Sequence, residues 1–142
     1  MFYGQTIHVP ANTIARSVLG KSSVVKVDRI RVCPGTTRQT WIGFPDGCYG
    51  LVHAVVCRGN VQVWPAEPGY SFNWNDYTYT FEDPLKLTAE PYEFTVKTWS
   101  YDDRFPHNLF FGVIVEPAPV IEVAVSMEQV LEELGITIGE TV

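Results

Sequence analysis

Apolar and polar residues alternate along most of the chain between residues 20 and 116. A period of two is typical of strands that bury one face, because successive side chains of a strand point to opposite sides. Turn signals rich in Pro and Gly interrupt the alternation roughly every 8–12 residues. The expected strands span residues 23–32, 37–44, 51–58, 61–64, 77–81, 85–87, 92–97 and 107–115. About eight short strands with this spacing predict an all-β fold, namely an antiparallel β-sandwich or jelly roll.

The first residues of the chain precede this series. They contain one alternating stretch, Thr6 to Val9, followed by a loop. We therefore expect residues 1–19 to form an N-terminal arm or an additional edge strand, and residues 20–116 to form the sandwich.

Residues 117–142 differ in character and are expected to form a C-terminal extension, hinged at the Pro-rich stretch where it begins. Ser126 and Gln129 have the spacing of a capping box, which predicts a short helix over residues 126–134. Its apolar positions form one stripe, which consists of Met127, Val130, Leu131 and Leu134. A helix of this length is unstable alone, so we expect it to dock on its own sandwich or on a neighbouring subunit.

Composition limits the class of partner. The chain has 142 residues, of which 46% are hydrophobic, and this suits one domain with a packed core. Its formal net charge is −6. Nucleic acids and anionic membranes attract basic surfaces, so neither is expected as the main partner. The sequence shows neither a secretory signal pattern nor an apolar run long enough to span a membrane, so we expect synthesis in a cytoplasm.

Residues with catalytic or metal-binding potential are scattered. His8, His53 and His107 lie far apart outside any metal-binding motif, and the last two are interpreted as structural. The carboxylate pairs at 82–83 and 102–103 are interpreted as solvated turn residues, with a calcium site or a catalytic pair as alternatives. A cupin-like metal enzyme would need a His-x-His motif, which the sequence lacks. We therefore expect no enzymatic activity, no metal and no cofactor.

The three cysteines, Cys33, Cys48 and Cys57, have spacings that fit neither a disulfide framework nor a metal knuckle. They are interpreted as buried free thiols. Cys48 stands in a glycine-rich turn, and we expect it to be the most exposed of the three.

Aromatic residues are concentrated between residues 64 and 81, where they alternate with Asn and Asp. The candidate ligand-binding or partner-binding aromatics are Trp64, Tyr70, Trp74 and Tyr77. Three interpretations remain open for this run: filling of the core, a protein interface, or stacking against sugar rings.

Three parts of the sequence resemble one family. They are Ile7 to Thr13, then Trp41 to His53 followed by Val61 to Pro65, and finally Glu90 to His107. Together they are similar to a group of small β-sandwich proteins associated with the genomes of tailed phages and environmental viruses. The resemblance spans about residues 5–116 and leaves residues 117–142 outside it. It implies a virion structural role, such as capsid decoration or a minor head protein, and carries over no catalytic residue.

The expected function is therefore that of a non-enzymatic virion structural protein made in the host cytoplasm. We expect it to form homo-oligomers or to bind a protein shell, such as the major capsid protein, through its arms. The expected interface residues are Ile7, Val9, Met127, Val130, Leu131, Leu134, Ile136 and Ile138. The alternative function is a carbohydrate-binding β-sandwich module that uses Trp64, Tyr70, Trp74 and Tyr77.

Overall fold

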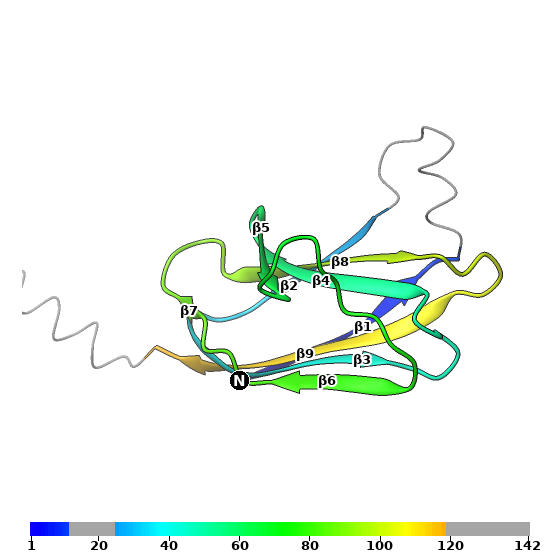
Figure 1. The fold of residues 1–142 in the computed structure, drawn as a ribbon. Coiled ribbons are helices and arrows are strands. Elements are labelled where there is room, and N and C mark those ends of the chain that lie inside the picture. Colours follow the sequence, from blue (N-terminus) through cyan, green and yellow to red (C-terminus); the bar gives the residue numbers. More distant parts are fainter. Residues whose placement is uncertain (12–24, 119–142) are drawn as a thin grey trace, which may run out of the picture.

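The computed structural model describes residues 1–11 and 25–118 of the chain. Within these residues nine strands form two antiparallel sheets (Figure 1). The strands are β1 (Phe2–Val9), β2 (Lys26–Arg31), β3 (Gly35–Phe44), β4 (Val52–Arg58), β5 (Val61–Trp64), β6 (Tyr77–Phe81), β7 (Lys86–Leu87), β8 (Glu93–Ser100) and β9 (His107–Pro117). In this part of the chain no helix is long and apolar enough to cross a membrane.

The two sheets lie face to face as two layers (Figure 1). Sheet A has the strand order β1-β9-β3-β6, with the short β7 also paired to β3. Sheet B has the order β2-β8-β4-β5. The predicted all-β class is thereby confirmed, and two packed antiparallel sheets are the arrangement of a β-sandwich. The helix predicted over residues 126–134 lies outside the described residues.

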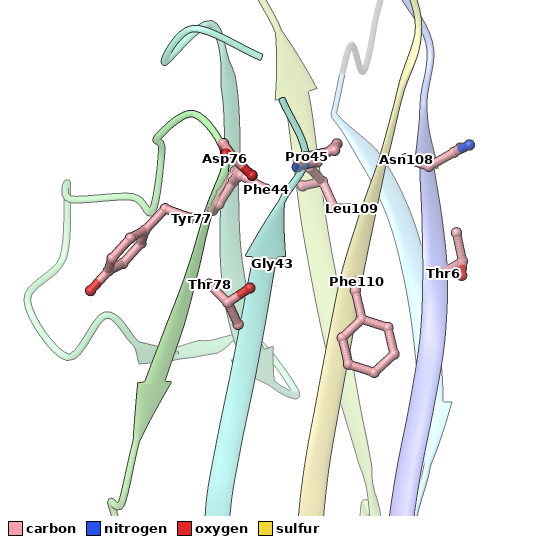
Figure 2. Close-up of a pocket in the computed structure, with 10 residues that line it drawn as sticks. All are labelled: Thr6, Gly43, Phe44, Pro45, Asp76, Tyr77, Thr78, Asn108, Leu109 and Phe110. Atoms are coloured by element: carbon pink, nitrogen blue, oxygen red, sulfur yellow. The ribbon is translucent and has the colours of Figure 1, made fainter. Parts of the chain in front are cut away.

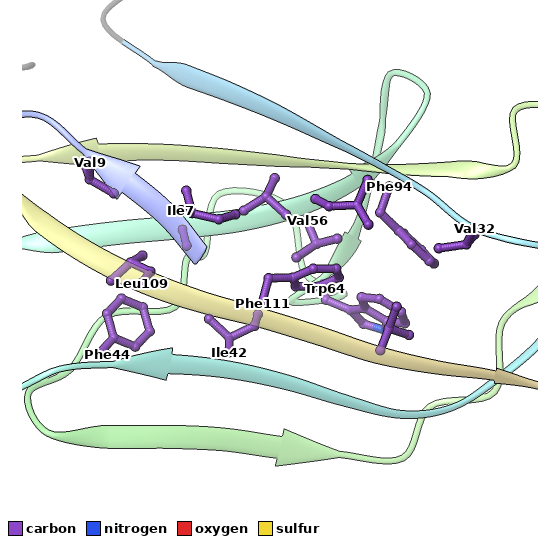
Figure 3. Packing of buried hydrophobic residues seen from close by; sticks show 14 of the residues in the cluster. Ile7, Val9, Val32, Ile42, Phe44, Val56, Trp64, Phe94, Leu109 and Phe111 are labelled. Atoms are coloured by element: carbon purple, nitrogen blue, oxygen red, sulfur yellow. The ribbon is translucent and has the colours of Figure 1, made fainter. Parts of the chain in front are cut away.

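The core lies between the two layers and is built from alternate residues of the long strands (Figure 3). Phe94 of β8 and Phe111 of β9 face each other there, with their ring centroids 6.2 Å apart. The Trp64 ring stacks on Phe94 at 5.2 Å, and its Nε1 donates a hydrogen bond of 2.8 Å to the Asp83 carboxylate. Burying each such large side chain contributes roughly 1.5–3 kcal/mol to folding.

The N-terminal stretch is an edge strand rather than an arm. All eight residues of β1 pair with β9, in a register that joins Phe2 to Ile114 and Val9 to His107. Ile7 and Val9 point into the core and are 1% and 0% exposed (Figure 3). Their expected place at an interface is therefore wrong for the described fold, because neither side chain has surface left for a partner. The alternation that was interpreted as an interface-forming arm instead packs this strand against its own sandwich.

The described strands otherwise follow the predicted ones closely. The main differences are extensions: β8 continues to Ser100 and β3 begins at Gly35. Thr98 and Ser100 are fully buried on the core side of β8. Because these core positions are polar, hydrophobic alternation alone predicts an end to this strand that is too early.

Candidate binding surfaces

The three histidines do not converge. His53 Nδ1 lies 2.8 Å from Ser71 Oγ, and its ring stacks on Trp99 at 5.4 Å. Burial lowers the pKa of His53 below its ordinary value. Nowhere in the described part of the chain do three or more His, Cys, Asp or Glu residues form a group able to hold a metal ion. His53 is therefore held by local contacts on the outer side of sheet B.

Asp102 organises the loop between β8 and β9. One of its carboxylate oxygens accepts the backbone N–H groups of Arg104 and Phe105, at 2.9 and 3.2 Å. The other lies 2.7 Å from Nε2 of His107. The hydrogen bond with His107 and that from the Arg104 N–H lower the pKa of this carboxyl group. Asp102 is therefore a turn residue with local partners, as predicted, but it is not solvated, because its side chain is only 12% exposed.

Cys48 lies close to this pair but is unsuited to nucleophilic chemistry. Its side chain is 0% exposed, which corrects the expectation that it would be the most exposed cysteine. Burial, and after it the negative charge of Asp102, raises the pKa of the Cys48 thiol to about 11. A thiol with this pKa is almost fully protonated at neutral pH and reacts poorly. Cys57 is also buried, whereas Cys33 is partly exposed.

The aromatic run between residues 64 and 81 divides into two groups. Trp64, at 3% exposure, belongs to the core and is removed from the candidate ligand-binding set. Tyr70, Trp74 and Tyr77 are exposed, and the rings of Trp74 and Tyr77 meet edge to face at 6.4 Å. The structure therefore supports the core interpretation for one tryptophan and leaves the other on the surface.

A small hollow, which we call the loop site, lies between two loops at one end of the sandwich. It has a volume of about 270 Å³ and is lined by Tyr49, Gly50, Asn73, Trp74 and Asn75. Tyr49 is 73% exposed and Trp74 is 58% exposed. Tyr49 precedes β4 in the chain, so sequence reasoning focused on residues 64–81 missed it.

Side-chain amides hold these two loops together. Asn75 Oδ1 accepts the N–H groups of Gly47 and Tyr49 at 2.8 and 2.9 Å. Asn73 Nδ2 donates to the Gly50 carbonyl at 3.1 Å, and the Gly50 N–H donates to the Trp74 carbonyl at 3.3 Å. Tyr49 itself has a φ of 48°, a left-handed conformation that is uncommon for a bulky residue. The exposed rings are therefore carried on a bonded backbone.

A second surface covers the outer side of sheet A. The strand register places four apolar side chains on this side, which we call the aromatic face: Phe2, Trp41, Phe110 and Ile114. Phe2 and Phe110 are 58% and 41% exposed, and the Phe2 and Trp41 rings meet edge to face at 5.8 Å. These residues come from β1, β3 and β9, so the alternation shows that they point outward but not that they lie together.

Glycines allow the rings to lie close to the sheet. Gly4 and Gly112 are opposite each other in the β1–β9 register. A Cβ on Gly112 would lie 3.0 Å from the Phe110 ring and 3.1 Å from the Phe2 ring. The two rings therefore cover the bare backbone, a packing that compensates for glycine within strands.

A shallow hollow of about 380 Å³ continues this surface toward the loops. Figure 2 shows Phe110, Thr78 and Thr6 around it, on three strands of the same sheet. Gly43 forms part of its floor, and a Cβ there would lie 3.2 Å from Thr78 Oγ1. The lining thus mixes hydroxyl groups with two exposed aromatic residues, Phe110 and Tyr77.

Comparison with known proteins gives no relative: no protein-family model, no curated protein and no solved structure matches the chain.

Proposed function

We propose that this protein is a non-enzymatic virion structural protein, of the capsid decoration or minor head type, which associates with its own copies or with a protein shell. The observation that carries the proposal is the aromatic face of sheet A. Contiguous exposed apolar surface is uncommon on monomeric proteins and marks sites of association. Phe2 and Phe110 are exposed by half or nearly half on this face.

The strand pairing supports a jelly-roll fold for this role. If the two-residue β7 is left aside, the first strand pairs with the last, β2 with β8, β3 with β6, and β4 with β5. This is the pairing of one long antiparallel hairpin rolled into two sheets. Viral capsid proteins and lectins are among the proteins built on jelly rolls. By analogy this fold suits a shell-associated role, and the resemblance expected from the sequence of residues 5–116 points the same way.

The side chains with catalytic potential support a non-enzymatic role. The Cys48 thiol is buried with its pKa raised to about 11, and the His53 ring stacks on Trp99 and meets Tyr101 edge to face. His107 and Asp102 are engaged with each other in a turn. These groups have structural partners that account for their positions.

Sedimentation velocity on the full chain over a range of concentrations tests the association. We expect oligomers, or co-sedimentation with the shell protein, and weaker association for Phe110→Thr. Val27→Thr is the matched control, because Val27 is 47% exposed on the outer side of sheet B. A full chain that stays monomeric and binds no shell contradicts the proposal.

Two further experiments address the virion and the C-terminal extension. Purified particles whose genome encodes this chain should contain it in stoichiometric amounts, and particles that lack it would overturn the virion assignment. Removal of residues 119–142 tests whether Met127, Val130, Leu131, Leu134, Ile136 and Ile138 contribute to association, since these residues lie outside the described structure.

A further inference from the structure

The loop site has the composition of a sugar-binding site. Aromatic rings present flat apolar faces on which the C–H groups of a pyranose ring can pack. Tyr49 and Trp74 supply two exposed rings at one hollow, and Asn73 and Asn75 supply polar groups beside them. A ligand that is apolar on its faces and rich in hydroxyl groups at its edges matches this combination.

The site is also organised before any ligand arrives. Asn75 fixes the backbone of Tyr49, and Asn73 is held through its side chain by Gly50 and through its carbonyl by the Tyr79 hydroxyl at 3.2 Å. Rigid aromatic groups lose little conformational entropy on binding. The left-handed backbone of Tyr49 adds to this argument, because such conformations cluster at ligand sites.

Nearby charge narrows the class of ligand. Asp46 accepts a hydrogen bond from Asn75 Nδ2 at 3.0 Å, and the Asp76 N–H donates to the Pro45 carbonyl. The exposed carboxylate of Asp46 therefore borders the site, and that of Asp76, the residue that follows Asn75, adds negative charge nearby. They disfavour sialylated or sulfated sugars, and they disfavour nucleic acids, which would need a basic groove beside the stacking rings. The same carboxylates can accept hydrogen bonds from sugar hydroxyls.

The size of the hollow agrees with this class. Its volume of about 270 Å³ is below the range of about 300–1,000 Å³ that holds drug-sized ligands. A site of this size suits one or two rings of an extended glycan, with the remainder in solvent. We propose that the loop site binds a neutral hexopyranose-containing glycan, stacked on Trp74 and Tyr49.

An array of neutral oligosaccharides built from glucose, galactose, mannose and N-acetylglucosamine tests the proposal on the full chain. Immobilised glycans are multivalent, so weak binding is retained. The best-bound sugar is then titrated by calorimetry. We expect Trp74→Ala and Tyr49→Ala each to weaken binding about tenfold or more, whereas Trp74→Phe retains part of the affinity because it keeps a ring.

Tyr70→Ala is the matched control. Tyr70 is 62% exposed and lies in the same connection, but it does not line the hollow, so its removal should leave affinity within about twofold. Unchanged urea midpoints show that each variant remains folded. The proposal is overturned if the wild-type chain binds no neutral glycan, if it binds only anionic glycans or single-stranded DNA, or if Trp74→Ala binds as well as the wild type.

Discussion

The outer faces of the two sheets differ although both sheets bury the same kind of inner face. On sheet B the outward positions of β2 and β8 include Arg29, Arg31, Glu93 and Lys97, and Arg31 stands opposite Glu93 in the register. Along the described outer face of sheet A, the corresponding central positions hold aromatic, isoleucine, glycine, threonine and amide residues and no charged residue. The inner alternation is enough to make the sandwich. The fold itself therefore does not require the difference between the outer faces.

Charged residues on an outer face keep sheets from stacking on one another, and their absence removes this protection. Sheet A carries charge only at one end, where Arg38 and Glu116 form an ion pair. Trp41 and Trp99 make the contrast concrete, because both are partly buried tryptophans on outer faces. Trp41 packs against the exposed Phe2, whereas Trp99 is covered by the stacked His53.

The largest expected effect is the difference in unfolding free energy between substitutions on the inner and outer sides of one strand, β9. Phe111 faces the core at 1% exposure, and its neighbour Phe110 faces outward at 41%. Phe111→Ala should lower the free energy of unfolding by about 3–5 kcal/mol, because it leaves a cavity. Phe110→Ala should cost less than about 1 kcal/mol. Urea denaturation measures both, and equal losses would mean that the aromatic face is covered within the chain itself.

Two glycines of sheet A give the next largest difference. A Cβ on Gly35 would lie 2.0 Å from the Glu116 carbonyl oxygen, so β3 and β9 must separate at that point. Gly35→Ala should therefore cost about 2–3 kcal/mol. The atoms nearest to a Cβ on Gly112 belong to the rings of Phe2 and Phe110, which can swing outward, so Gly112→Ala should cost less than about 1 kcal/mol. Thermal denaturation of both variants checks this, and a large loss for Gly112→Ala would show that the rings are fixed in place.

Tryptophan fluorescence tests which face is covered on association. When concentration is raised until the chain associates, the emission should shift to shorter wavelength because Trp41 loses contact with water. The shift should disappear in Trp41→Phe and persist in Trp99→Phe. If instead the shift disappears in Trp99→Phe and persists in Trp41→Phe, the chain associates through sheet B, and the proposed role of the aromatic face of sheet A is contradicted.

The smallest effect concerns pH and sheet B. Burial lowers the pKa of His53 in the folded chain, so the unfolded chain binds the proton more readily. Stability should therefore fall as pH drops through the ordinary histidine value of about 6.5, and His53→Gln should lessen this dependence. Urea midpoints at about pH 7.5 and about pH 5.5 measure it. His8→Gln, at an exposed position, is the control, and an unchanged slope in His53→Gln contradicts the prediction.

Hydrophobic alternation predicted the strands well because each sheet has one buried face. It does not show which side faces inward where the register changes. In β5 a shift in the β4–β5 register places Trp64 in the core and leaves Val61 67% exposed. A tryptophan in the core and one on the surface were therefore indistinguishable in the sequence.

The candidate surfaces were less predictable than the strands. The loop site combines residues 49–50 with residues 73–75, and only the fold brings these segments together. Cys48 differs from its prediction for a related reason. Its glycine-rich turn folds back, with the Leu51 N–H donating to the Cys48 carbonyl at 2.8 Å, and the thiol is enclosed. Local composition indicates that a segment turns, but it does not show what the turn packs against.

The sandwich also has a direction. The backbone of Met1 is hydrogen-bonded to that of Val115, and the Ala118 N–H donates to the Pro34 carbonyl. Both ends of the described sandwich therefore lie at the end opposite the loops that carry Tyr49 and Trp74 (Figure 1). A partner bound at the end that holds Met1 and Ala118 would leave the loops that carry Tyr49 and Trp74 on the side away from it. The described ends of the chain and the exposed rings of the loop site thus lie at opposite ends of the sandwich.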